Sequence, residues 1–163
     1  MNWPSTFAIN LCCCFLWLNS IFLDLSSAIC FCIVGQFRAL ADQLFRNPDY
    51  HKHVRKEIFK QLKHFRKLYE GYVPMNYKGY LRKMKKSGEW GDHVTLQAAA
   101  DRFQAKICLV TSFRDTCYVE IIPKDKNPTR ELWLSFWSEV HYNSLYATGD
   151  VPTRKPRKKY WLF

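Results

Sequence analysis

The distribution of charge divides this chain of 163 residues sharply at Gly35. Residues 1–37 carry a single charged side chain, Asp24, whereas all 25 Lys and Arg residues follow Gly35. The part that follows Gly35 combines many charges with many aromatic residues, as a globular domain with a surface and a core requires. The sequence therefore predicts an apolar leader over residues 1–34, one domain after it, and a short tail.

The leader admits two interpretations. Residues 7–34 are largely apolar and long enough to cross a bilayer, so a membrane anchor is one of them. Polar residues interrupt the stretch, however, and Asp24 lies where a charge is costly in a membrane. The first six residues also lack the basic residues with which a secretory signal begins. The other interpretation is a wrongly assigned exon boundary, in which case the leader is translated intron.

A codon argument supports the intron hypothesis. If an intron ending in AG splits a Cys codon (TGY) after its T, translation of the intron end gives Val34 and then GGY, a Gly codon. Thymine-rich intron sequence also translates into Phe, Leu, Ile, Ser and Cys, which dominate residues 7–34. Transcripts with a Cys codon before Gln36 would support this hypothesis, and transcripts that encode the leader would contradict it.

Charge and cysteine content limit the class of protein. The net charge of +11 suits an anionic partner of some kind but identifies none. Five of the seven cysteines lie in the leader, and their spacing is typical neither of a disulfide framework nor of a metal site. The seven cysteines stand at positions 12, 13, 14, 30, 32, 108 and 117. We expect no metal site, and a reducing compartment, the cytoplasm or nucleus, with membrane anchoring as the alternative.

Hydrophobic periodicity changes along the domain. Apolar residues at helical spacing predict four helices, at residues 36–45, 49–68, 76–87 and 92–103. Runs rich in β-formers then predict strands at 106–111, 117–122, 132–137 and 140–146, the first two joined as a hairpin. Helices followed by strands indicate an α+β fold. The tail, residues 149–163, places five basic residues before aromatic ones and suits a nuclear-import patch, a contact with an anionic surface or a solvated end.

Three motifs resemble one family. "QFRALADQLF" at 36–45, "GEWGDHVTLQAAADRF" at 88–103 and "HYNS" at 141–144 resemble, in order and spacing, the OTU family of cysteine proteases, most closely its plant branch. The resemblance implies a papain-like OTU domain over residues 35–148, with a small sheet flanked by helices. It also implies hydrolysis of the isopeptide bond after the C-terminal glycine of ubiquitin, with no metal and no cofactor. The implied partner is ubiquitin or polyubiquitin, and no nucleic acid is expected.

The resemblance also assigns site residues. Asp-Gly-Asn-Cys normally precedes the first motif, so the nucleophilic Cys position falls on Gly35 and the Asp position on Cys32. His141 would be the general base, and Asn143, two residues on along a strand, would orient its imidazole. The loop that contains Glu89, Trp90 and Gly91 would bind substrate.

The missing thiol decides the expected activity. Glycine has no side chain to replace the nucleophile, and the sulfur of Cys32, three residues upstream, would lie several ångströms from the helix start. We therefore expect no hydrolysis by the chain as written, and expect it to bind ubiquitin as a pseudoenzyme. A membrane-tethered interaction protein is the alternative. A gene product with Cys at position 35 would be an active deubiquitinase.

Overall fold

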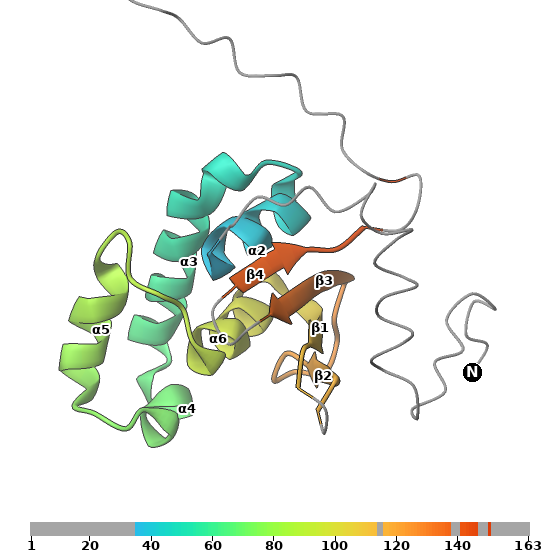
Figure 1. Cartoon of the computed structure of the whole chain (residues 1–163). Coiled ribbons are helices and arrows are strands. Elements are labelled where there is room, and N and C mark those ends of the chain that lie inside the picture. Colours follow the sequence, from blue (N-terminus) through green and yellow to red (C-terminus); the bar gives the residue numbers. More distant parts are fainter. Residues whose placement is uncertain (1–34, 114–115, 138–140, 147–149, 151–163) are drawn as a thin grey trace, which may run out of the picture. The chain divides into compact units, whose positions relative to one another are not determined.

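The computed structural model of this chain describes residues 35–113, 116–137, 141–146 and 150. All of them belong to the second of the two units into which the chain divides, residues 31–163. The predicted apolar leader, and the predicted basic tail apart from Asp150, lie outside the described residues. Helices precede strands along the described chain, which confirms the α+β class (Figure 1). The helical elements are α2 (Gln36–Phe45), η1 (Pro48–Tyr50), α3 (His51–His64), α4 (Arg66–Tyr69), η2 (Glu70–Tyr72), α5 (Tyr77–Lys85) and α6 (His93–Phe103).

The four described strands form one mixed sheet. They are β1 (Ala105–Thr111), β2 (Tyr118–Ile121), β3 (Arg130–Trp137) and β4 (His141–Ser144), in the spatial order β2-β1-β3-β4. β1 and β2 pair antiparallel, which confirms the predicted hairpin. β3 instead pairs parallel with β1, and β4 pairs antiparallel with β3. The loop before β3 is held at the start of β1 because the Thr129 amide donates to the Gln104 carbonyl at 2.7 Å.

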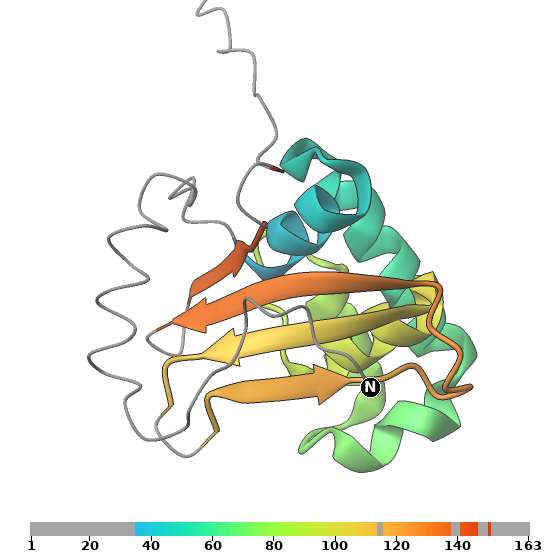
Figure 2. The ribbon, with the colours of Figure 1, turned by 90° about the vertical axis from the view of Figure 1, so that its right-hand side faces the viewer.

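The described helices lie on one face of this sheet (Figures 1 and 2). α2 packs on β3 and β4, α6 packs on β1, α3 covers both helices, and α5 packs on α3. The core lies between these layers, and its fully buried members include Leu40, Ile58, Leu96 and Leu134. Ala98, Ala99 and Ala100 of α6 have no exposed surface, and their small side chains let α6 approach the sheet closely.

Several helix ends differ from expectation by one or two residues, and one predicted helix is interrupted. The helix predicted over 49–68 is divided, because Phe65 leaves helical geometry at φ −108°, ψ 43° and separates α3 from α4. Asp92 begins α6 as predicted, through a capping box in which its carboxylate accepts from the Thr95 amide. Of the described helices, none combines the length and apolar character that a bilayer-spanning segment requires.

A buried carboxylate joins α3 to α6. Glu57 is 7% exposed and accepts from Lys60 Nζ at 2.6 Å and from Arg102 Nε at 3.0 Å. The hydrogen bond from Lys60, followed by that from Arg102, lowers the pKa of Glu57 to about 2. The ionised carboxylate of Glu57 therefore holds α3 and α6 together.

Replacing Glu57 by Gln is expected to lower the free energy of unfolding by about 1.5–3 kcal/mol at pH 7. Because the folded-state pKa lies below that of the unfolded chain, this contribution is present above about pH 4.3 and is lost as the pH falls towards 2. Denaturant unfolding at pH 7 and pH 3 should show the difference between parent and variant shrinking at the lower pH. Glu70→Gln, which removes an exposed pair with Arg66, is the control and should cost under about 0.5 kcal/mol. A difference that is equal at both pH values would contradict this role of Glu57.

Candidate active site

Helix α2 and strand β4 run side by side in the same direction (Figure 1). Their C-terminal ends are joined by Gln43, whose Nε2 donates to the Leu145 carbonyl at 2.8 Å and whose Oε1 accepts from the Trp133 amide at 2.9 Å. The Ser144 hydroxyl also donates to the Asp42 carboxylate. Two polar residues of α2 thus fix the position of the helix along the strand.

The same pairing brings Gly35 and His141 to one end. From Gln43 back to Gln36 the helix rises about 10 Å, and from Leu145 back to Tyr142 the strand rises about 10 Å. The two elements meet again there, since the Gln36 side chain lies beside the Tyr142 hydroxyl and offsets part of the rise in its pKa that burial causes. Gly35 and His141 each stand one residue beyond this second contact.

Gly35 is the N-cap of α2. It is exposed, its φ of −56° is one that any residue adopts, and its carbonyl accepts from the Arg38 amide at 2.8 Å. A Cβ built at this position would have no heavy atom of the described residues within 4 Å. A larger side chain at position 35 therefore displaces none of these residues, at a helix end that favours negative charge.

His141 and Asn143 are half-buried on β4 and alternate with Tyr142 and Ser144. The alternating pair Tyr142 and Ser144 faces α2, so His141 and Asn143 share the other side of the strand. Burial raises the pKa of the Tyr142 hydroxyl, which keeps this ring neutral beneath the strand. Among the described strands β4 is an edge of the sheet, so His141 and Asn143 lie on an edge strand.

The loop before α6 contacts the start of α2 through a buried network. Thr95 Oγ1 donates to Gln36 Oε1 at 2.6 Å, and Gln36 Nε2 donates to the Asp92 carbonyl at 3.0 Å. The Tyr80 hydroxyl donates to Asp92 Oδ1 at 2.9 Å. A Cβ at Gly91 would lie 1.7 Å from Gln36 Oε1, so only glycine allows this approach. The predicted Gly91 therefore lies against the residue that follows Gly35.

The remaining loop residues are held by Arg55 of α3. Its guanidinium lies 3.8 Å from the centroid of the Phe37 ring and donates to the Glu89 carbonyl. Trp90, the next residue, is 60% exposed. The structure thus presents a large aromatic side chain on a loop that is anchored to α2 from both sides.

The cysteines of the described residues do not replace a nucleophile at position 35. Cys32 lies outside these residues. Cys108 is fully buried on β1, where burial raises the pKa of its thiol, the opposite of what activates a nucleophile. Cys117 is half-buried beside β2. Within the described residues no group of three or more His, Cys, Asp or Glu is arranged to hold a metal ion.

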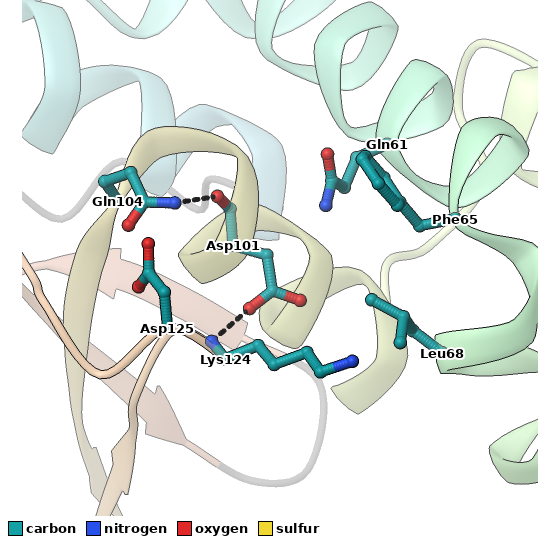
Figure 3. A pocket seen from close by; sticks show the side chains of 7 residues that line it. All are labelled: Gln61, Phe65, Leu68, Asp101, Gln104, Lys124 and Asp125. Carbon is teal, nitrogen blue, oxygen red and sulfur yellow. Dashed lines mark hydrogen bonds between the residues drawn. The ribbon is translucent and has the colours of Figure 1, made fainter.

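A cavity of about 340 Å³ lies elsewhere, between α3, α4, α6 and the loop after β2 (Figure 3). It is lined by Gln61, Phe65, Leu68, Asp101, Gln104, Lys124 and Asp125. The Asp101 carboxylate is already occupied by the Tyr69 hydroxyl at 2.6 Å and the Lys124 amide at 2.8 Å. No residue of α2, β4 or the Trp90 loop lines this cavity, so it is separate from the candidate site.

The start of α2 lies beside a strand that carries a His. This arrangement is typical of papain-like proteins, the class to which the fold and the candidate site point. A sequence model of the OTU-like cysteine proteases matches residues 35–145. The chain therefore belongs to the OTU family.

Relatives and solved structures agree with this assignment. The chain is 78% identical over 133 residues to OVARIAN TUMOR DOMAIN-containing deubiquitinating enzyme 11 of Arabidopsis thaliana, a match that covers 78% of this chain and 54% of that protein. It is 67% identical over 129 residues to enzyme 12 of the same series, with 78% and 59% covered. The solved OTU domain of OTUD1 superimposes with a TM-score of 0.65 at 16% identity, over 81% of this chain and 94% of that one. The chain spans a little over half the length of these two curated relatives.

These findings confirm the family and fold predicted from the motifs. The roles of Gly35, Cys32, His141, Asn143, Glu89, Trp90 and Gly91 stay predictions. Several residues around the site were missed, namely Gln36, Asp42, Gln43, Arg55, Thr95 and Ser144. The Asp92-x-x-Thr95 spacing was available as a capping signal, but its contact with Gln36, 59 residues away, had no local signal.

Proposed function

We propose that this chain carries the ubiquitin-directed site of an OTU deubiquitinase in which the nucleophile position is vacant. The observation that carries the proposal is the N-cap position of Gly35, exposed and at the same end of the α2–β4 pair as His141. The high identity to proteins named deubiquitinating enzymes supports ubiquitin as the partner. As written, the chain binds ubiquitin and does not hydrolyse its isopeptide bonds.

The proposed chemistry follows from what each position supplies. A thiol at position 35 would lie at a helix N-terminus, where the macrodipole and free amides stabilise a thiolate. The His141 imidazole would take the thiol proton and later give it to the leaving amine. Asn143, on the same side of β4, would hold the imidazole in the tautomer that this transfer requires. Because β4 is an edge among the described strands, the two side chains would meet beyond the edge of the sheet.

Glycine at position 35 lacks the thiol but leaves His141 and Asn143 in place. Without a thiolate no acyl-enzyme can form, and His141 alone has no bound nucleophile to activate. The substrate-binding surface does not depend on the thiol. Trp90, which is 60% exposed on an anchored loop, is proposed as the main contact for the ubiquitin tail. The backbone of the neighbouring residues Glu89 and Gly91 would contact the tail beside it.

Titration of the purified chain with diubiquitin tests this function. Binding without cleavage is expected, and Trp90→Ala should weaken it about thirtyfold, as loss of an aromatic hot spot does. Tyr72→Ala, which removes another exposed aromatic residue on the far helices, is the matched control and should leave the affinity unchanged. The absence of any ubiquitin binding, or an equal effect of both substitutions, would overturn the proposal.

A further inference from the structure

Residues 51–86, which form α3, α4 and α5, carry almost the whole net charge of the protein. They contain 12 of the 25 Lys and Arg residues but only 2 of the 14 Asp and Glu residues, so they account for +10 of the net +11. Both acidic residues are already engaged: Glu57 with Lys60 and Arg102, and Glu70 with Arg66. The positive charge of this helical layer is therefore not balanced within the layer.

On α3 the charge faces outward along the length of the helix. Lys52, Lys56 and Lys63 are exposed and spaced by four and seven residues, so they share one face. Val54 and Ile58, on the opposite face, are buried in the core. The helix thus has one side for the fold and one side on which the charged residues are all basic, beside the half-buried Phe59.

The adjacent helix repeats this pattern. Lys78, Arg82 and Lys85 of α5 lie on the outside at spacings of four and three. Arg55 of α3 fixes α5 in place because its Nη1 donates to the Met84 carbonyl at 3.2 Å, and Figure 1 shows α5 on the side of α3 away from the sheet. Within the described part of the chain, none of the six outward basic residues of the two helices forms an ion pair.

Apolar side chains are exposed where the two basic helices are connected. Phe65 is 47%, Tyr72 71% and Met75 49% exposed, and all three lie between the end of α3 and the start of α5. Basic residues beside exposed aromatic and aliphatic ones are the composition of surfaces that lie on anionic membranes. The basic residues are attracted to the headgroups, and the apolar ones enter the acyl boundary.

We propose that the α3–α5 layer binds an anionic lipid surface. Lipid is favoured over nucleic acid because the outward charges are mostly Lys, which attracts phosphate without fixed geometry, while Arg55 donates to backbone carbonyls inside the fold and Arg66 is paired with Glu70. A nucleic acid would also offer no partner to Met75. This binding would be peripheral and independent of the leader, and it goes beyond the proposed ubiquitin site.

Sedimentation of the full chain with vesicles tests this proposal. Binding is expected to vesicles of phosphatidylcholine with phosphatidylserine, not to phosphatidylcholine alone, and to weaken as salt is raised. Because each basic residue near such a surface contributes about fivefold, the variant Lys78→Gln, Arg82→Gln, Lys85→Gln should bind roughly a hundredfold more weakly. Replacing Tyr72 and Met75 by Ser should also weaken binding, by about tenfold.

The matched control removes the same charge elsewhere. Lys155, Lys158 and Lys159 of the tail, replaced by Gln, should leave vesicle binding within about twofold of the parent, because the proposal assigns the contact with headgroups to α3 and α5 alone. Helical content and thermal unfolding of each variant verify folding. The proposal is overturned if the full chain does not bind the anionic vesicles, if the tail variant loses as much binding as the α5 variant, or if single-stranded RNA of equal charge competes the chain off the vesicles.

Discussion

A Gly35→Cys variant is expected to cleave diubiquitin that the parent chain only binds. The thiol would lie at the N-cap of α2, where the structure leaves open space and the helix end stabilises a thiolate. Removal of a nucleophile from a complete triad costs on the order of 10⁶ in turnover, so restoring it should raise cleavage by roughly 10³ to 10⁶. Diubiquitin cleavage over time, followed on gels, measures this gain.

Two further variants identify the source of that activity. Adding His141→Ala to Gly35→Cys should lower cleavage by about 10² to 10⁴, as loss of a general base does. Adding His64→Ala, which removes an exposed His at the end of α3, should leave cleavage unchanged. A ubiquitin probe with a C-terminal alkyne, which captures a nearby thiolate, gives a second measurement. If Gly35→Cys neither cleaves diubiquitin nor reacts with the probe, position 35 is not the nucleophile position.

Gly91→Ala is expected to destabilise the fold by about 2–4 kcal/mol. The added Cβ would meet Gln36 Oε1 at 1.7 Å and Thr95 Oγ1 at 2.9 Å. Gln36 is 2% exposed and has no free space to enter, so the cost combines overpacking with the loss of buried hydrogen bonds. Denaturant unfolding of the parent and the variant measures it. Because the displaced Gln36 follows Gly35, ubiquitin binding should also weaken.

Another glycine serves as the control. Gly79 lies in α5, and its nearest neighbour to an added Cβ is Met75 Cε at 3.5 Å, an ordinary contact. Gly79→Ala should therefore stabilise the helix by about 0.5–1 kcal/mol, the opposite sign. In a Gln36→Ala background the penalty of Gly91→Ala should shrink, since the main clash is gone. A Gly91→Ala variant as stable as the parent would show that the close approach is not maintained in solution.

Local signals accounted for the elements that the sequence predicted correctly. α2 follows the apolar spacing of residues 36–45, and α6 begins where Asp92 supplies a cap. The break at Phe65 was missed because the apolar stripe continues through it. The parallel pairing of β3 with β1 was missed. The polar composition of the connection between β2 and β3 does not show whether β3 pairs with β2 or passes it to pair with β1.

Only those residues of the candidate site that belong to the three family motifs were predictable from the sequence. The motifs point to Gly35, His141 and the Trp90 loop, but the residues that place them act over long separations. Gln43 bonds to Leu145 across 102 positions, and Thr95 bonds to Gln36 across 59. Such pairs carry no periodicity, since each partner alone is an ordinary polar residue on a helix or strand.

The double contact of Gln43, with Trp133 of β3 and with Leu145 directly after β4, limits how the chain can vary in length. One residue inserted or deleted between position 35 and Gln43 would turn the helix start by about 100° and shift it by about 1.5 Å relative to β4. Position 35 would then leave the end of the strand where His141 lies, and Phe37 and Leu40 would also turn away from the core in which they are buried. Insertions in the loop between β2 and β3 have no such effect on α2. Among homologous domains, we therefore expect the spacing from position 35 to Gln43 to be invariant while that loop changes length.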